Sequence, residues 1–252
     1  MATVVLVVGV GVGLWATWDS TRVSDGSTLR AGPSPLLGST TTSRATTTTV
    51  PELPTCGPGD EPVEGDPLAG WSTIVVDTNR ALPPDFAPPD LVEVTAAGFA
   101  QRDRVRQFVI PDLAALRQAA DANGTPIVVI SGYRSYAYQQ GLFQDEVNRV
   151  GEAQAAAGVA RPGHSEHQLG TAIDVLNPEA GELTAAFADT PAGRWLAAHA
   201  HEYGFVLSYP ADAQDRSCYQ YEPWHLRYVG RDVAAQIHDA GVSPREWLLV
   251  NR

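Results

Sequence analysis

The stretch Ala160–Val175 reads Ala-Arg-Pro-Gly-His-Ser-Glu-His-Gln-Leu-Gly-Thr-Ala-Ile-Asp-Val, and it joins a polar loop to a short apolar run. Glycine and proline are frequent in its first half, which is typical of a loop. The second half, Thr171–Val175, is rich in β-branched residues and predicts a strand. The polar and titratable side chains crowded into this stretch are Arg161, His164, Ser165, Glu166, His167 and Asp174. A loop with this chemistry that leads into a strand is typical of a functional site.

Secondary-structure signals extend on both sides of this stretch. Proline at a first helical position predicts helices from Pro111 to Ala122, from Thr190-Pro191 to Tyr203 and from Ser243-Pro244 to the C-terminus. Further helices are expected after the turn Ser131–Ser135, as far as about Val150, and over Arg231–Ala240. The other predicted strands are Ser72–Val76, Pro126–Ile130, Phe205–Ser208 and Glu222–Val229. Short strands scattered among helices, without regular βαβ alternation, predict an α+β fold around a small antiparallel sheet.

Composition narrows the class of protein. The chain has 252 residues, is 44% hydrophobic and carries a formal net charge of −12. All of its basic residues are Arg, because the sequence contains no Lys. We therefore expect no nucleic-acid partner, since no basic cluster is present. Chemistry that needs a lysine, such as a Schiff base or a Walker-type phosphate loop, is excluded.

The N-terminal part of the chain differs from the rest. Residues 2–18 are uncharged and apolar, a length that is marginal for a bilayer core of roughly 30 Å. We expect residues 1–18 to be an uncleaved membrane anchor, with a cleaved signal segment as the alternative. Residues 19–55 are rich in Ser, Thr and Pro and lack aromatic residues, so we expect a disordered linker. The folded domain is expected over residues 56–252, in an extracytoplasmic location.

The sequence contains two cysteines, Cys56 and Cys218, whose spacing matches no metal or redox motif. In an exported protein such a pair is expected to form one disulfide. The alternative is two unrelated buried thiols.

Three separate segments carry candidate catalytic chemistry. Two histidines and one carboxylate form the open ligand set of a catalytic zinc ion; His167, Asp174 and His225 supply such a set. Glu222 is the candidate general base and acid beside it. Because residues three apart in a strand face opposite sides, this role requires an irregular backbone around Pro223. Composition alone does not decide whether His164 or His167 is the metal ligand in this stretch.

The motifs resemble a known family. Ser165-x-His167-x-x-Gly170-x-Ala172-x-Asp174 and the later Glu222-Pro-Trp-His225-x-Arg-Tyr-Val-Gly resemble the signature of VanY-like D-alanyl-D-alanine carboxypeptidases. These belong to the zinc peptidase group that includes lysostaphin-type enzymes and the hedgehog fold. Ser131-Gly-Tyr-Arg-Ser-Tyr-x-x-Gln139 and the block from Asn79 to Val92 agree with the family as well, so the resemblance covers roughly residues 72–230.

The resemblance implies a role for each matching residue. His167, Asp174 and His225 would bind one Zn²⁺, and Glu222 would be the general base and acid. Arg134 would face the substrate carbonyl or terminal carboxylate, with a structural ion pair as its alternative. Gln139 and Ser165 resemble substrate-contacting positions, although each could simply brace its own segment. Two departures from the family, Ser208 in place of a frequent Arg and Cys218 in place of a small residue, leave substrate preference open.

The implied function is hydrolysis of peptidoglycan stem peptides, with release of the C-terminal D-alanine. No obligate protein partner is evident in the sequence, and the membrane would be contacted through the N-terminal segment. An LD-carboxypeptidase or a peptidoglycan endopeptidase would use the same zinc site. A non-catalytic wall-binding or zinc-stabilised module is the alternative from a different functional class.

Overall fold

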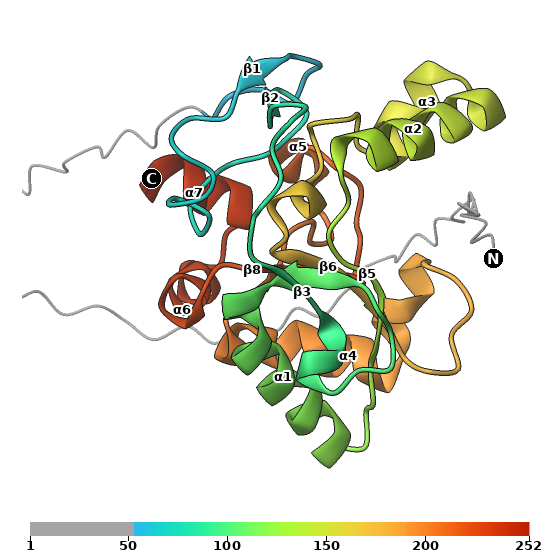
Figure 1. The fold of residues 1–252 in the computed structure, drawn as a ribbon, viewed down its shortest axis with the longest axis vertical. Helices are drawn as coiled ribbons and strands as arrows, with labels where there is room; N and C mark the ends of the chain where they lie inside the picture. The colour runs from blue at the N-terminus through green and yellow to red at the C-terminus, as the bar shows by residue number, and fades with distance from the viewer. Residues whose placement is uncertain (1–52, 252) are drawn as a thin grey trace, which may run out of the picture. The chain divides into compact units, whose positions relative to one another are not determined.

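The computed structural model describes residues 53–251, and these residues are built around a four-stranded antiparallel sheet (Figure 1). The sheet contains β5 (Val128–Ser131), β6 (Ala172–Leu176), β8 (His225–Tyr228) and β7 (Phe205–Leu207), in that spatial order. Each neighbouring pair is antiparallel. The predicted α+β class with a small antiparallel sheet is therefore confirmed.

The two faces of this sheet differ in polarity. Alternate residues of a strand point to opposite faces, and those on one face, including Ile173, Val175 and Leu226, belong to the main hydrophobic core. The helices α1 (Ile110–Ala122) and α4 (Pro191–His199) lie on the same side of the sheet and complete that core (Figure 1). The residues between them in sequence are polar: Asp174 in β6, and His225 and Arg227 in β8. The opposite face of the central strands is thus buried but polar.

The remaining elements surround this sheet. Helices α2 (Tyr136–Val150) and α3 (Glu152–Gly158) pack against each other (Figure 1). The other helices are α5 (Gln214–Ser217), α6 (Arg231–Ala240) and α7 (Pro244–Asn251). Two small sheets add β1 (Glu61–Pro62) parallel to β2 (Arg80–Ala81), and β3 (Leu91–Glu93) antiparallel to β4 (Arg104–Arg106). Within residues 53–251, five 3₁₀ segments, η1 to η5, cover Val94–Ala97, Gln107–Val109, Glu166–Leu169, Ala185–Asp189 and Ala200–Tyr203.

The helix predictions agree closely with the structure. Helix α1 ends at Ala122 and buries Leu113, Leu116 and Ala120 on the face that its spacing predicts. Ser135 caps α2 by accepting a hydrogen bond from the Tyr138 amide at 3.2 Å. The helix expected over residues 190–203 is divided into α4 and the 3₁₀ turn η5, and it ends at Gly204 with φ of +82°. The prediction missed α3 and the β3–β4 hairpin.

The predicted strand Ser72–Val76 is wrong. The amides of Thr73 and Ile74 donate to the Gly70 carbonyl at 2.9 and 3.0 Å, which makes a turn. The carbonyls of Trp71 and Ile74 accept from the Arg227 guanidinium at 3.0 and 2.6 Å. Because a buried side chain satisfies these backbone groups, the segment is apolar and buried without belonging to a sheet.

The segment after residue 53 is fastened to the C-terminal part of the domain. Cys56 and Cys218 form a disulfide, which confirms that prediction. Arg245 of α7 donates to the Asp77 carboxylate at 2.7 Å and to the Pro54 carbonyl at 3.1 Å. A covalent link and a buried ion pair therefore hold the start of the described domain against its end.

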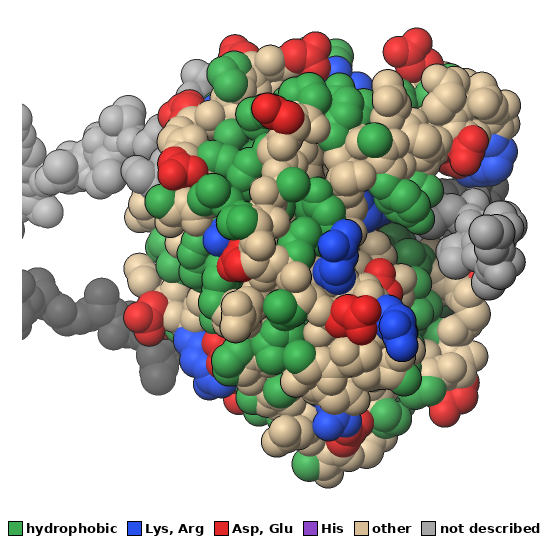
Figure 2. Space-filling model, in the orientation of Figure 1, with side chains coloured by type: hydrophobic (Ala, Val, Ile, Leu, Met, Phe, Trp, Pro, Cys, Tyr) green, Lys and Arg blue, Asp and Glu red, His purple; other side chains and the backbone are tan. Residues whose placement is uncertain are grey.

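The predictions for residues 1–18 and for most of residues 19–55 lie outside the described residues. Within residues 53–251 no helix has the length and hydrophobicity that crossing a membrane requires. On the face shown in Figure 2, arginine and carboxylate side chains are interspersed among polar and apolar surface. That face presents no basic stripe of the kind that binds nucleic acid.

Candidate metal centre and catalytic residues

Strand register brings together two candidate ligands that are far apart in sequence. Asp174 of β6 lies directly opposite His225 of β8 in the antiparallel pair. Opposed residues project to the same face of a sheet, and Asp174 Oδ1 lies 3.1 Å from His225 Nδ1. The polar face of the sheet is therefore where this pair meets.

His167 reaches the same place from the 3₁₀ turn η3. Its Nδ1 lies 2.6 Å from the Gly132 carbonyl oxygen, which fixes Nδ1 as the protonated nitrogen. Its Nε2 lies 3.2 Å from Asp174 Oδ2. That Nε2 is buried and has no hydrogen-bond partner among the described residues. A buried, unpartnered nitrogen aimed at a carboxylate is the arrangement expected of a metal ligand.

The donor set fits zinc. One ligand atom from each of His167, Asp174 and His225 lies within 4.8 Å of the others, and all three residues are buried. Burial, and next the nearby Arg134, lower the pKa of His167 to about 4, so its imidazole is neutral at neutral pH. Burial alone would raise the pKa of Asp174, but the histidines and Arg134 lower it well below its usual value. Two imidazoles and one carboxylate leave a zinc ion one open position for chemistry.

Glu222 stands next to this set without belonging to it. Its carboxylate oxygen Oε2 lies 3.9 Å from His225 Nδ1, and its side chain is 21% exposed. The His225 amide donates to the Glu222 carbonyl at 3.1 Å, so the two residues are joined by a turn that precedes β8. This is the irregular backbone that the sequence predicts around Pro223. Burial raises the pKa of Glu222 to about 7, and the Asp174 and Glu166 carboxylates add to this shift.

Arg134 is a further neighbour of Asp174. Its Nη2 is 3.9 Å from Asp174 Oδ2, and its side chain is 21% exposed. Its Nε is buried without a hydrogen-bond partner among the described residues. The backbone amide of Arg134 donates to the His167 carbonyl at 3.3 Å, which ties this turn to η3. The distance to Asp174 is long for an ion pair, so hydrogen-bonding capacity remains for a bound anion.

Ser165 and Gln139 already hold their own segments. The Ser165 hydroxyl accepts from the His167 amide at 3.4 Å and caps η3. The Gln139 side chain donates from Nε2 to the Ala160 carbonyl at 2.7 Å. Both residues are buried, and these contacts match the bracing alternative. The predicted contact of either residue with substrate stays a prediction.

His164 is also buried, but its ring nitrogens face the Asp77 carbonyl and Asp60, away from the three-ligand group.

The sequence reasoning missed Glu166 and Arg227. Glu166 is buried and accepts from Arg227 Nη1 at 2.8 Å and from Ser208 Oγ at 2.6 Å. Burial opposes its charge, but Arg227, His225 and Ser208 lower its pKa to about 2. A signal was available, because Arg227 lies two residues after His225 and so shares its face of β8. A buried arginine on that face requires a carboxylate partner.

The two departures from the family pattern have structural explanations. Ser208 is buried, and its hydroxyl donates to Glu166. Cys218 has φ of +71°, a left-handed conformation in which a residue with a side chain is uncommon, and it is held by the disulfide. Each of these residues serves the protein's own packing in the described domain.

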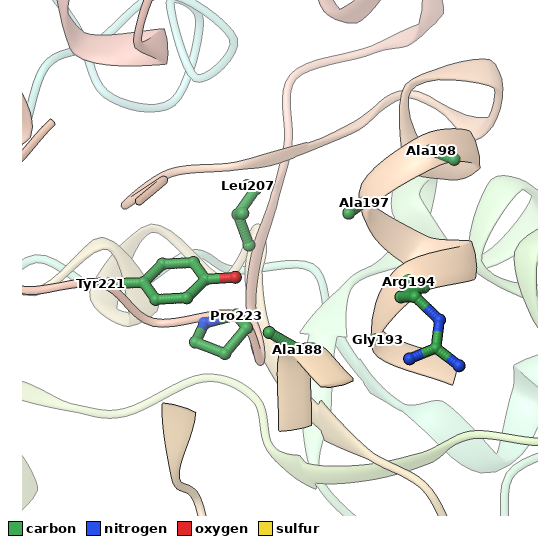
Figure 3. Close-up of a pocket in the computed structure, with 8 residues that line it drawn as sticks. All are labelled: Ala188, Gly193, Arg194, Ala197, Ala198, Leu207, Tyr221 and Pro223. Carbon is green, nitrogen blue, oxygen red and sulfur yellow. The ribbon is translucent and has the colours of Figure 1, made fainter. Parts of the chain in front are cut away.

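A pocket of about 440 Å³ lies beside the Glu222 segment (Figure 3). Tyr221 and Pro223, the two neighbours of Glu222 in the chain, form one wall. Helix α4 forms the opposite wall, from which Arg194 projects, and the hydroxyl end of Tyr221 points toward that helix (Figure 3). The pocket is lined by Ala188, Gly193, Arg194, Ala197, Ala198, Leu207, Tyr221 and Pro223. Its surface is mainly apolar, with one cationic group.

Comparison with known proteins gives consistent matches. A D-alanyl-D-alanine carboxypeptidase of Enterococcus faecalis is 32% identical over 187 residues, which cover 71% of this chain and 66% of that protein. The chain thus spans about two thirds of the length of this relative. The LdcB LD-carboxypeptidase structure is 38% identical, with a TM-score of 0.63, and the match covers 69% of this chain and 84% of LdcB.

A third match contains a metal. The structure of a variant of the vancomycin resistance D,D-pentapeptidase VanY, in complex with Zn(II), is 31% identical with a TM-score of 0.62. It covers 71% of this chain and 99% of that structure. The family model VanY, described as D-alanyl-D-alanine carboxypeptidase, matches residues 102–231, which include every candidate ligand and both candidate catalytic residues. The chain therefore belongs to the VanY family of D-alanyl-D-alanine carboxypeptidases.

Proposed function

We propose that the protein is a zinc-dependent peptidase of peptidoglycan stem peptides that removes the C-terminal D-alanine. The observation that carries this proposal is the position of Glu222, a carboxylate with a pKa of about 7, 3.9 Å from one nitrogen of a three-ligand metal set. A non-catalytic zinc module has no need for a titrating carboxylate at that place. Membership of the VanY family supports the same reaction.

The proposed roles follow from the positions of the side chains. His167, Asp174 and His225 would hold the zinc ion. Zinc bound there supplies a Lewis acid that polarises a carbonyl and lowers the pKa of water. Glu222 takes the proton from the attacking water and returns it to the departing amine, which suits a group with a pKa near neutrality.

Arg134 has a separate role on the substrate. Its guanidinium lies 3.9 Å from the Asp174 carboxylate, and its Nε has no hydrogen-bond partner among the described residues. We assign it to the substrate carbonyl or terminal carboxylate, because a guanidinium forms strong charge-assisted hydrogen bonds with such oxygens. A terminal carboxylate fixed at Arg134 would restrict cleavage to the last peptide bond and so make the enzyme a carboxypeptidase.

The pocket beside Glu222 provides a place for the rest of the stem peptide. Tyr221 and Pro223 continue directly from Glu222, whereas Arg134 lies beside Asp174. We assign the pocket to residues upstream of the cleaved bond. Its apolar lining suits alanine methyl groups, and Arg194 suits an acidic residue of the stem.

Digestion of purified muropeptides by the zinc-loaded full chain, followed by mass spectrometry, tests the function. Loss of a single alanine from pentapeptide stems, with tetrapeptide stems left intact, is the expected result. Loss of alanine from tetrapeptides instead would establish the LD-carboxypeptidase alternative, and cleavage of cross-linked dimers would establish an endopeptidase. A zinc-loaded protein that leaves all three substrates intact contradicts an enzymatic role.

We also propose that residues 1–18 anchor the protein to the cell membrane and that residues 19–55 tether the domain outside the cytoplasm. The apolar, uncharged composition of the first segment and the Ser/Thr/Pro-rich composition of the second support this. Fractionation of cells that express the full chain, with protease added to intact spheroplasts, tests it. The full-length protein is expected in the membrane fraction and accessible to protease. Release of a shortened protein into the medium would indicate a cleaved signal segment instead.

A further inference from the structure

Glu166 occupies an unusual position, because a buried carboxylate lies between two residues that serve the metal centre. It follows Ser165, which caps η3, and it precedes the ligand His167. Its side chain points toward β8 and the end of β7 and reaches the ring nitrogen of His225 that does not face Asp174. There Oε1 accepts from Arg227 Nη1 at 2.8 Å, and Oε2 accepts from Ser208 Oγ at 2.6 Å and faces His225 Nε2 at 3.0 Å.

The His225 ring has a different carboxylate at each of its nitrogens. Nδ1 lies 3.1 Å from Asp174 Oδ1, on the side where the three candidate ligands meet. Nε2 lies 3.0 Å from Glu166 Oε2. A neutral imidazole has one lone pair and one N–H. If Nδ1 gives its lone pair to the ion, Nε2 must carry the proton, and Glu166 is placed to accept it.

The surroundings of Glu166 keep its acceptor in place. Arg227 is 1% exposed and also donates to the Trp71 and Ile74 carbonyls, so its guanidinium cannot swing away. The Tyr209 ring stacks on the His225 ring, with centroids 4.7 Å apart and an interplanar angle of 29°. The imidazole is thus restrained by a ring on its face and by a fixed carboxylate at its edge.

We infer that Glu166 is a positioning residue for the zinc ion, one that selects His225 Nδ1 as the donor atom and holds its ring in place. The inference rests on the zinc site of the proposed function. His167 has the corresponding arrangement with a weaker acceptor, the neutral Gly132 carbonyl, at its Nδ1. The two histidines therefore present opposite ring nitrogens to the ion, each fixed by an acceptor outside the ligand group.

The substitution Glu166→Gln tests this while nearly preserving side-chain shape. Both carboxylate oxygens face donors, so a glutamine must turn its NH₂ group toward either Arg227 or the His225 and Ser208 pair. Loss of such a partner typically weakens metal binding about 10- to 100-fold. Competition of the full chain with a chromophoric chelator for zinc measures this, and the visible spectrum of the cobalt-substituted protein reports a changed ligand field.

Glu146→Gln is the matched control. Glu146 is another buried carboxylate that accepts from an arginine, with Arg149 Nε at 2.8 Å, but it lies in α2 and contacts no candidate ligand. The control is expected to bind zinc like the wild type, with an unchanged cobalt spectrum. Wild-type zinc affinity and spectrum in Glu166→Gln would overturn the inference.

A measurement on the wild type covers the case in which Glu166→Gln does not fold. In the zinc-loaded full chain with ¹⁵N-labelled histidine, NMR is expected to show His225 with metal-bound Nδ1 and a proton on Nε2. Metal-bound Nε2 would overturn the inference. Zinc binding is measured here without any peptide substrate, so failure of the peptidase assay leaves this result unaffected.

Discussion

Burial and neighbouring charge assign different protonation states to the groups of the site. His167 is neutral because burial and Arg134 lower its pKa to about 4, and a neutral imidazole can bind a metal. Asp174 stays ionised because two histidines and Arg134 outweigh its burial. Glu222 lacks a comparably close cation, and burial raises its pKa to about 7. The protonation states of His167 and Asp174 thus suit metal binding, whereas the pKa of Glu222 suits proton transfer.

Glu222→Ala is expected to lower kcat by about 10²- to 10⁴-fold, which is the usual contribution of a general acid–base residue. Zinc content should stay at one ion per chain, because Glu222 is outside the ligand set. Steady-state assays on a pentapeptide together with metal analysis measure both quantities. His167→Ala is the contrasting variant and should lose zinc and activity together. Equal loss of zinc in Glu222→Ala would mean that Glu222 is a ligand.

Gly132→Ala is expected to weaken zinc binding about tenfold or more by displacing the acceptor of His167 Nδ1, a change comparable to loss of that acceptor. A Cβ atom at Gly132 would come within 2.5 Å of the Arg104 carbonyl oxygen, and the backbone must shift to avoid this contact. Zinc titration in the presence of a competing chelator measures the effect.

Gly141→Ala is the control for the Gly132 variant. A Cβ there meets no atom within 4 Å, and the residue lies inside α2. It should keep wild-type zinc affinity and raise the free energy of unfolding by up to about 1 kcal/mol through helix propensity. Equal zinc affinity in both variants would show that the Gly132 carbonyl does not position His167.

At the scale of elements, the pairing of β6 with β8 makes the metal site and the space between α4 and β7 makes the pocket. Register places Asp174 opposite His225 and Ala172 opposite Arg227. A shift of one residue would turn His225 and Arg227 into the hydrophobic core. The segment between β7 and β8 then places Tyr221 and Pro223, the two neighbours of Glu222 in the chain, across the pocket from α4 (Figure 3). One connection thus positions both the candidate base and the wall of the pocket.

Arg194→Ala is expected to raise KM about two- to fivefold for a muropeptide with an acidic upstream residue, and to leave kcat unchanged. The magnitude corresponds to about 0.5–1 kcal/mol, the range of an exposed ion pair, and binding that is equal in ground and transition states changes KM alone. The same variant should process acetyl-D-Ala-D-Ala like the wild type, because that substrate lacks the upstream residues. An equal rise in KM for both substrates would contradict the assignment of the pocket.

At the scale of the described domain, a buried polar network joins segments from both of its ends. Asp77 accepts from Arg80 at 3.2 Å and from Arg245 at 2.7 Å, and all three residues are buried. Arg245 also donates to the Arg216 carbonyl at 3.1 Å, close to the disulfide at Cys218. Because one buried carboxylate is shared by two guanidinium groups, its protonation would remove the Arg245 ion pair and leave Arg80 with only its long contact to Glu64, at 3.9 Å.

Stability is expected to fall in acid through Asp77. Burial raises the pKa of this carboxyl, but Arg245 and the amides of Asn79 and Arg80 outweigh it and lower the pKa below 3.8. A lowered folded-state pKa stabilises the protein at neutral pH, and this stabilisation is lost as pH falls through the folded pKa. Thermal unfolding between pH 7 and pH 2 should therefore show Asp77→Asn with a lower Tm at neutral pH and a difference that shrinks below about pH 4.

Asp215→Asn is the control for the acid experiment. Asp215 has a side chain that is 83% exposed, and its contact with Arg216 is long, at 3.8 Å. Its removal should leave Tm close to that of the wild type across the same pH range. A difference between wild type and Asp77→Asn that stays constant down to pH 2 would show that the charge of Asp77 contributes nothing to stability.

The sequence alone determined much of this protein. Proline and glycine at helix ends, with apolar residues at helical spacing, predicted α1, α2, α6 and α7, because local backbone preferences set those boundaries. The motifs around His167 and Glu222 predicted the three-ligand group and the carboxylate beside it. The two cysteines match no metal or redox motif, and the expected export of the protein then predicted their disulfide.

Only the tertiary structure decided which contacts complete the site. Strand register set His225 opposite Asp174, and the turn after β5 supplied the Gly132 carbonyl to His167. The predicted strand over residues 72–76 was wrong because a distant residue replaces the strand partner. Arg227, more than 150 residues later, donates to the carbonyls of Trp71 and Ile74. Glu166 was unassigned because its partners come from β8 and from Ser208, the residue after β7. Local sequence governs the backbone, whereas the pairing of buried charges depends on residues that only the fold brings together.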